Sequence, residues 1–210
     1  GGAVGDRESH AAVGHYAQPF YLSLFCFGTL SPLLSIPSRL VAFAGWLPRN
    51  LASTMLFLLS AALSVRFGTI AHPYLLADNR HYTFYLWKNL MGRYYWLRYA
   101  LTPLYLVSLH TVASAISKTL SPLKISLLCV CSALVLVPAG LIECRYFAIP
   151  TLLVLLHIPL PSPSSKPVSF EWLAEFACLG GFALVNAITV GVYVWRPFVW
   201  PDGSIARFMW

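Results

Sequence analysis

The chain has 210 residues, of which 58% are hydrophobic and only 10% are charged, and its mean hydropathy is +0.69. A soluble domain carries roughly 25% charged residues, so this composition excludes a water-soluble globular protein and indicates a polytopic helical membrane protein. The formal net charge is +7, but Lys and Arg are scattered and form no basic block, so we expect no nucleic-acid partner.

The first segment, residues 1–15, is hydrophilic and contains Asp6, Arg7 and His10. It has neither the basic leader nor the apolar core of a signal peptide. The chain also begins at Gly1 rather than at Met, so we expect it to be a piece of a longer protein that begins partway through.

Five long apolar stretches follow, each with no charged residue or almost none. A helix needs about 20 apolar residues to cross a bilayer, so we predict an all-α membrane protein with about five transmembrane helices in a single region. The predicted spans are 16–36, 50–66, 99–116, 125–142 and 173–195.

Five crossings would divide the remaining segments between the two sides of the membrane. Lys and Arg are almost equally numerous on the two sides, so the positive-inside rule does not orient the chain. All acidic residues except Asp202 fall on the first side, where we therefore expect the chemistry. The first side would carry 1–15, 67–98 and 143–172, and the second would carry 37–49, 117–124 and 196–210.

The segment after the second span concentrates polar side chains, because Asp78, Asn79, Arg80 and His81 are consecutive. An aromatic stretch from 82 to 99 follows, and we predict that it forms a helix in the membrane interface, where Tyr and Trp favour headgroup depth. A plain aromatic belt beside the next span is the alternative. We predict a bend in this helix at Gly92. The predicted apolar stripe of the helix consists of Phe84, Trp87, Leu90 and Met91.

The segment 143–172 begins with another pair of opposite charges, Glu143 and Arg145. The apolar run that follows is too short to cross a bilayer comfortably, and Pro150 interrupts it. We predict a re-entrant or surface-lying piece and then a stiff loop rich in Pro and Ser. A sixth short crossing is the alternative, and it would place Glu171 on the opposite side.

Three clusters on the first side each combine a carboxylate with an Arg: Asp6-Arg7 with His10, residues 78–81, and Glu143 with Arg145. Local ion pairing would explain any one of them. The planar guanidinium of Arg also suits phosphate, and a lipid phosphate arrives at this depth, so a phosphate-binding pocket is a second hypothesis. No Cys/His spacing suits zinc and no nucleotide-binding motif is present, so we expect neither a metal nor a cofactor.

The chain contains four motifs that also occur, in the same order, in one known family. In these motifs it resembles the endoplasmic-reticulum alpha-1,2-glucosyltransferases, which add the last glucose to the lipid-linked oligosaccharide. The core of the second motif, ADNRHYTFY, is long enough to make chance a poor explanation. The motifs are Gly5-Asp6-Arg7 with His10, Leu75–Tyr85 (LLADNRHYTFY), Glu143-x-Arg145-Tyr146-Phe147 with Pro150, and Arg207-Phe208-Met209-Trp210.

The resemblance implies a multi-pass lipid-sugar glycosyltransferase fold in the endoplasmic reticulum membrane, with a luminal active face. Such an enzyme transfers glucose from dolichyl phosphate glucose, by inverting displacement, to Glc2Man9GlcNAc2-PP-dolichol, and so completes the donor glycan for protein N-glycosylation. The partners would be these two dolichol-linked substrates and the lipid bilayer. A non-catalytic membrane scaffold or a channel-regulating subunit is the alternative.

The resemblance also implies roles for individual residues. Arg80, His81 and Arg145 would hold the donor phosphate, and the spans beside the interfacial helix would form a groove for the polyprenyl chains. The chain would be the C-terminal part of such an enzyme, and the catalytic base is expected upstream of it. The residues expected on the acceptor side, or in support of the phosphate-binding residues, are Asp78, Asn79, Tyr82, Asp6, Arg7 and Glu143.

Overall fold

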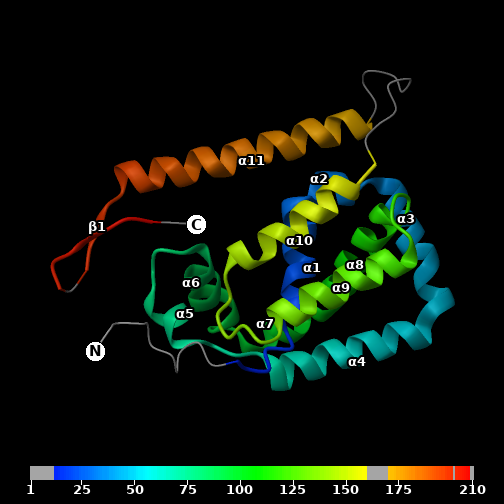
Figure 1. The fold of residues 1–210 in the computed structure, drawn as a ribbon, viewed down its shortest axis with the longest axis horizontal. Coiled ribbons are helices and arrows are strands. Elements are labelled where there is room, and N and C mark those ends of the chain that lie inside the picture. Colours follow the sequence, from blue (N-terminus) through cyan, green and yellow to red (C-terminus); the bar gives the residue numbers. More distant parts are fainter. Residues whose placement is uncertain (1–11, 160–169, 201, 209–210) are drawn as a thin grey trace.

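Helices form about three quarters of the computed structural model, which describes residues 12–159, 170–200 and 202–208 (Figure 1). Asp6, Arg7 and His10 lie outside these residues. The sheet in the described part is a short antiparallel pair, β1 (Phe198–Val199) and β2 (Ile205–Ala206). The helices are α1 (Gln18–Thr29), α2 (Ser31–Leu34), α3 (Pro37–Trp46), η1 (Leu47–Asn50), α4 (Leu51–Gly68), α5 (Pro73–Ala77), α6 (Tyr82–Leu86), η2 (Trp87–Met91), α7 (Tyr95–Ala100), α8 (Thr102–Ile116), α9 (Pro122–Leu136), α10 (Cys144–His157) and α11 (Phe170–Trp195).

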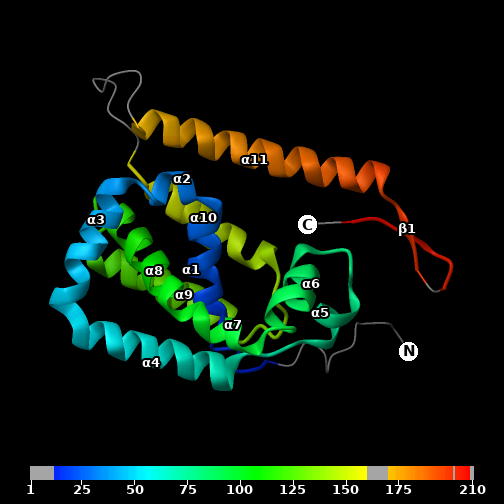
Figure 2. The same cartoon turned by 180° about the vertical axis from the view of Figure 1, so that it is seen from behind.

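Helices α1, α8, α9 and α10 pack together in the middle of the bundle, while α4 and α11 lie along opposite sides of it (Figures 1 and 2). Within the described residues, three helical stretches are long and apolar enough to cross a membrane: Pro37–Gly68, Tyr95–Ile116 and Trp172–Trp195. Two shorter helices, α9 and α10, are also apolar. These helices agree with an all-α membrane protein and contain the predicted spans 50–66, 99–116 and 173–195.

The predicted first span, 16–36, is divided into two helices. α1 ends at Thr29, and the four-residue helix α2 follows with Pro32 in its first turn. α3 then begins at Pro37. A proline starts a helix easily because its missing N–H has no partner to satisfy there, but it does not continue one, so the chain changes direction at both positions.

The predicted link 37–49 is wrong, because these residues are helical and lead directly into α4. Arg39 and Arg49 suggested a loop, but apolar residues occupy most of the positions between them. The helical stretch Pro37–Gly68 has 32 residues, and its most apolar 18-residue window has a mean hydropathy of 1.6. Figure 1 shows the turn between α3 and α4 that redirects it.

The path of α10 differs from the predicted re-entrant or surface-lying piece within 143–172. α10 has 14 residues and therefore a length of about 21 Å, enough to connect the two ends. At its far end the Thr119 hydroxyl donates to the His157 carbonyl at 2.6 Å, so α10 ends where α8 ends. This path agrees with the alternative of a sixth short crossing. The apolar run is short, but α10 nevertheless extends from one end of the bundle to the other.

The C-terminal segment lies at the same end as 67–98, contrary to the prediction for 196–210. Trp200 Nε1 donates to Asn79 Oδ1 at 3.1 Å, and both views place the hairpin near α5 and α6 (Figures 1 and 2). The prediction failed because it counted an odd number of traverses, whereas α10 adds one and α11 then returns.

The predicted helix over 82–99 consists of three pieces, α6, the π-helical turn η2 and α7. The helix stops at Gly92, as expected, and the Gly92 amide donates to the Trp87 carbonyl at 2.6 Å. Within the predicted stripe, Trp87 and Met91 are buried, but Leu90 is 43% exposed. A π-helical turn shifts the spacing of the side chains that follow it, so the stripe does not continue on one face.

Candidate functional site

The turn between α5 and α6 is organised by the carboxylate of Asp78. Arg80 Nε donates to Asp78 Oδ1 at 2.8 Å and Arg80 Nη2 donates to Oδ2 at 2.7 Å, which is a bidentate pair. The Arg80 amide also donates to Oδ1, and His81 Nε2 lies 3.3 Å from Oδ2. These hydrogen bonds lower the pKa of the Asp78 carboxyl and raise the pKa of the Arg80 guanidinium, so both groups remain charged at neutral pH.

The C-terminal hairpin covers one side of this turn. Besides its bond to Asn79, the Trp200 ring lies 5.1 Å from Arg80 Cζ in a cation–π contact. The ring of Phe208 meets the ring of Tyr82 edge to face at a centroid distance of 4.8 Å. Sequence reasoning missed Trp200 as a contact of the cluster, since more than a hundred residues separate it from Asn79.

Tyr82 joins the turn to α11. Its hydroxyl donates to Thr189 Oγ1 at 2.7 Å, and Thr189 Oγ1 in turn donates to the Val185 carbonyl within α11. Thr189 is buried, although the neighbouring residues of this helix are largely exposed. Tyr82 is therefore a positioning contact for the end of α11.

Glu143 and Arg145 form an ion pair at the start of α10. The side chain of Arg145 is 69% exposed, whereas that of Glu143 is 17% exposed, so the guanidinium reaches outward from a more enclosed carboxylate. The guanidinium also lies 5.6 Å from the ring of Tyr146. A planar cation so placed can turn part of its N–H donors toward an anion.

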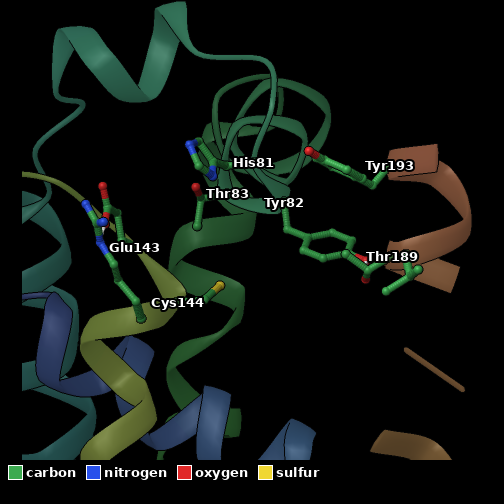
Figure 3. A pocket seen from close by; sticks show the side chains of 9 residues that line it. His81, Tyr82, Thr83, Glu143, Cys144, Thr189 and Tyr193 are labelled. Carbon is green, nitrogen blue, oxygen red and sulfur yellow. Dashed lines mark hydrogen bonds and ion pairs between the residues drawn. The ribbon is translucent and has the colours of Figure 1, made fainter. Parts of the chain in front are cut away.

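A cavity of about 430 Å³ brings three parts of the chain together (Figure 3). Figure 3 shows Tyr82 directed toward Thr189, and the Cys144 thiol directed between α10 and α6. We call this space the polar cavity. Its lining residues are His81, Tyr82 and Thr83 from the start of α6, Glu143, Cys144 and Arg145 from the start of α10, and Thr189, Val190 and Tyr193 from α11.

Four residues predicted for the site therefore meet in one place: His81, Tyr82, Glu143 and Arg145. Arg80 does not line this cavity, because its guanidinium turns back to Asp78. The side chains of Asp78 and Asn79 line a different space on the other side of the turn.

An apolar cavity of about 450 Å³ adjoins the polar cavity, because Thr83 and Cys144 line both. Almost all of its wall is hydrocarbon. Its lining residues come from α1, α5, α6, η2, α7, α8 and α10 and include Phe25, Leu75, Trp87, Tyr105 and Phe147. The predicted groove beside the 82–99 segment has a structural counterpart in this space.

A buried polar network fixes the loops at this end of the bundle. His15 is fully buried, its Nδ1 lies 3.3 Å from the Gly140 carbonyl, and its Nε2 accepts from the Ile70 amide at 3.4 Å. Gln18 donates to the carbonyls of Ala139 and Leu141. Burial lowers the pKa of His15 to about 4, so the imidazole is neutral. The network ties the start of α1 to the loop that leads to Glu143.

Within the described ranges, no group of three His, Cys, Asp or Glu residues lies close enough together to hold a metal ion. The chemistry available to the polar cavity in this part of the chain is that of a guanidinium, an imidazole, a carboxylate, a thiol and hydroxyl groups. Such a set suits recognition of an anion and of sugar hydroxyls.

Comparison with known proteins gives consistent relatives. A human protein named Dol-P-Glc:Glc(2)Man(9)GlcNAc(2)-PP-Dol alpha-1,2-glucosyltransferase is 38% identical over 210 residues, which cover 99% of this chain and 42% of that protein. Proteins of the same name from Arabidopsis thaliana and Drosophila melanogaster are 35% and 36% identical, with 100% and 99% of this chain covered and 41% and 44% of those proteins.

This chain thus spans less than half of the length of these relatives. No solved structure matches it. The model of the DIE2/ALG10 family matches residues 1–156, which is most of the chain and includes the 78–81 turn and the Glu143–Arg145 pair. The chain belongs to the DIE2/ALG10 family.

Proposed function

We propose that the protein to which this chain belongs transfers glucose from dolichyl phosphate glucose to Glc2Man9GlcNAc2-PP-dolichol in alpha-1,2 linkage. The names of the relatives describe this donor, this acceptor and this linkage. The product is the completed donor glycan for protein N-glycosylation. We place the protein in the endoplasmic reticulum membrane, with the end of the bundle that carries the polar cavity facing the lumen.

The observation that carries the proposal is the junction of the polar cavity with the apolar cavity at Thr83 and Cys144. A lipid phosphate sugar needs a cationic, hydrogen-bonding site for its head beside a hydrocarbon space for its chain. Arg145 and His81 supply donors on the polar side of the junction. Phe147 and Trp87 line the apolar side, where an isoprenoid would leave water.

In the proposed reaction a hydroxyl oxygen of the acceptor forms a bond to C1 of glucose while the bond from C1 to the phosphate oxygen breaks. The electron pair of that bond leaves with dolichyl phosphate, whose negative charge increases. Arg145 and His81 would stabilise this charge where it develops. The base that takes the hydroxyl proton is not assigned to a residue of this chain.

The role proposed for Arg80 changes with the geometry. Its Nε and Nη2 are both bonded to Asp78, and its guanidinium lies against Trp200. Since Arg80 also does not line the polar cavity, we assign it to holding the turn in shape, and we assign the phosphate to Arg145 and His81, which do line that cavity.

A transfer assay tests the proposal. The protein expressed from its complete coding sequence, in cells that lack their own enzyme of this kind, is expected to convert the diglucosylated lipid-linked glycan to the triglucosylated one. Dolichyl phosphate mannose serves as the control donor and should give no product. A non-catalytic scaffold would leave the diglucosylated glycan unchanged, and that result would refute the proposal.

A further inference from the structure

We infer that the cavity on the other side of the 78–81 turn binds a hexose residue of the acceptor glycan. This cavity has a volume of about 460 Å³ and is lined by Tyr74, Leu76, Ala77, Asp78, Asn79, Phe84 and Trp200. We call it the aromatic cavity. The inference rests on the proposed function, because the glycan acceptor is taken from it.

Three aromatic side chains give this cavity the chemistry of a sugar platform. Trp200 and Phe84 are half-buried and Tyr74 is 44% exposed, so part of each remains accessible. The C–H bonds on one face of a pyranose carry small positive charges, and the face of an aromatic ring is negative, so the two surfaces pack favourably.

The Trp200 ring is held in place before any ligand arrives. Asn79 Oδ1 accepts from its Nε1, and the Arg80 guanidinium lies against the ring at 5.1 Å. A fixed ring loses little side-chain entropy when a ligand binds, which favours affinity.

Asn79 supplies the polar contact that a sugar hydroxyl needs. Its carbonyl oxygen is used by Trp200, and among the described residues no acceptor for its Nδ2 is found, so the two N–H donors remain for a ligand. Asp78 has a different part, because both of its oxygens already accept hydrogen bonds from Arg80. The carboxylate fixes the turn that presents Asn79.

The lining argues against a phosphate and against a lipid chain. Among the described residues no Lys, Arg or His lines the aromatic cavity, and the one charged group in its wall, the Asp78 carboxylate, does not attract an anion. The adjoining polar and apolar cavities already offer a place for the donor phosphate and its chain. A neutral polar ligand with apolar faces, which is a carbohydrate, fits the remaining space.

The position of the aromatic cavity supports an acceptor role. Asp78 and Asn79 line it, while His81 and Tyr82, only two or three residues further along the chain, line the polar cavity. One short turn therefore separates the two spaces. An acceptor glycan held on the Trp200 side could present its terminal sugar to a donor glucose bound on the other side.

Steady-state kinetics of the whole protein with Trp200→Leu and Trp200→Phe test the inference. Leu removes the aromatic face, so we expect the KM for the lipid-linked acceptor to rise about tenfold, equivalent to about 1.4 kcal/mol. The KM for dolichyl phosphate glucose should stay within about twofold of the wild-type value, because a separate cavity is proposed to hold the donor. Phe keeps a ring face but lacks Nε1–H, and it should restore most of the acceptor affinity.

Val199→Ala is the matched control, because Val199 neighbours Trp200 in the hairpin but is 68% exposed and does not line the cavity. Asn79→Ala provides a second variant if Trp200→Leu does not fold, and it too should raise the acceptor KM selectively. An unchanged acceptor KM in both variants, or equal increases in both substrate KM values, would overturn the inference while the proposed function stood. A wild-type protein that transfers no glucose would refute both.

Discussion

At the scale of single residues, the two Arg residues of the predicted phosphate site differ in how far their guanidinium groups are already bonded to neighbouring side chains and in how exposed they are. Arg80 is half-buried and bonded through Nε and Nη2 to Asp78. Arg145 is paired with Glu143 but remains largely exposed at the edge of the polar cavity. The same residue type therefore holds a turn in one case and is available to an anion in the other.

His15 gives a prediction for the pH dependence of stability. Its pKa is lowered from 6.5 to about 4 in the folded protein, so between these values the unfolded chain binds a proton that the folded chain does not. Stability due to this group is complete above about pH 6.5 and is lost as the pH falls toward 4, by up to about 3 kcal/mol.

A comparison of wild type with His15→Gln in detergent checks this prediction by thermal unfolding at several pH values. The variant should be less stable than wild type at pH 7, because it loses the contacts of the imidazole with the Gly140 carbonyl and the Ile70 amide. Between about pH 6.5 and 4.5 its stability should fall less than that of wild type, because glutamine does not titrate. Parallel pH profiles for the two proteins would show that His15 does not carry the effect.

At the scale of elements, the break between η2 and α7 depends on Gly92. A Cβ atom at this position would lie 2.9 Å from the Trp87 carbonyl oxygen, which is backbone and cannot turn aside. Arg98 packs over the Trp87 ring at 4.6 Å and donates to the Met91 carbonyl, so a shift of the turn would disturb these contacts too.

We therefore expect Gly92→Ala to destabilise the protein by about 1–3 kcal/mol, the usual range for overpacking. Gly45→Ala in α3 is the control, because a Cβ there meets nothing within 4 Å and alanine favours a helix. Thermal unfolding in detergent separates the two. Equal melting temperatures for Gly92→Ala and wild type would mean that the turn adapts at no cost.

The two charged clusters at this end of the bundle were easier to recognise in the sequence than the path of the chain was. The 78–81 cluster and the Glu143–Arg145 pair were recognisable because charge is rare in this composition and because the motifs resemble a family. In the structure His81 and Arg145 line the same cavity. This proximity could not be predicted from either segment alone.

The errors have physical causes that lie beyond local sequence. α10 is shorter than an ordinary membrane-spanning helix, so a length criterion placed it at one end of the bundle. The two Arg residues of 37–49 lie in α3 and η1, among side chains that are mostly apolar. Trp200 reaches Asn79 only because α11 returns along the bundle, which depends on every traverse before it.

At the scale of the whole molecule, the arrangement places three spaces around the start of α6. The apolar cavity lies among the helices, the polar cavity lies between α6, α10 and α11, and the aromatic cavity lies beneath the C-terminal hairpin. Large apolar side chains such as Leu59 in α4, Leu134 in α9 and Leu184 in α11 are exposed, as expected where lipid replaces water.

α11 touches the rest of the described structure mainly at its two ends. Near its start, the Cys178 sulfur lies 3.8 Å from the Thr29 carbonyl oxygen, and near its end Thr189 accepts from Tyr82. The residues from 179 to 188 between these contacts are exposed. The wall that α11 gives to the polar cavity therefore depends on the Tyr82 bond.

The most direct test of the account is the dependence of glucose transfer on Arg145, measured with saturating acceptor and varied dolichyl phosphate glucose. For Arg145→Ala in the whole protein we expect kcat/KM for the donor to fall by about 100-fold, because a charge-stabilising donor is lost where phosphate leaves. Lys124→Ala, which removes an exposed cation at the start of α9, should leave the value unchanged. A donor kcat/KM for Arg145→Ala equal to that of wild type would contradict the assignment of the polar cavity to the donor phosphate.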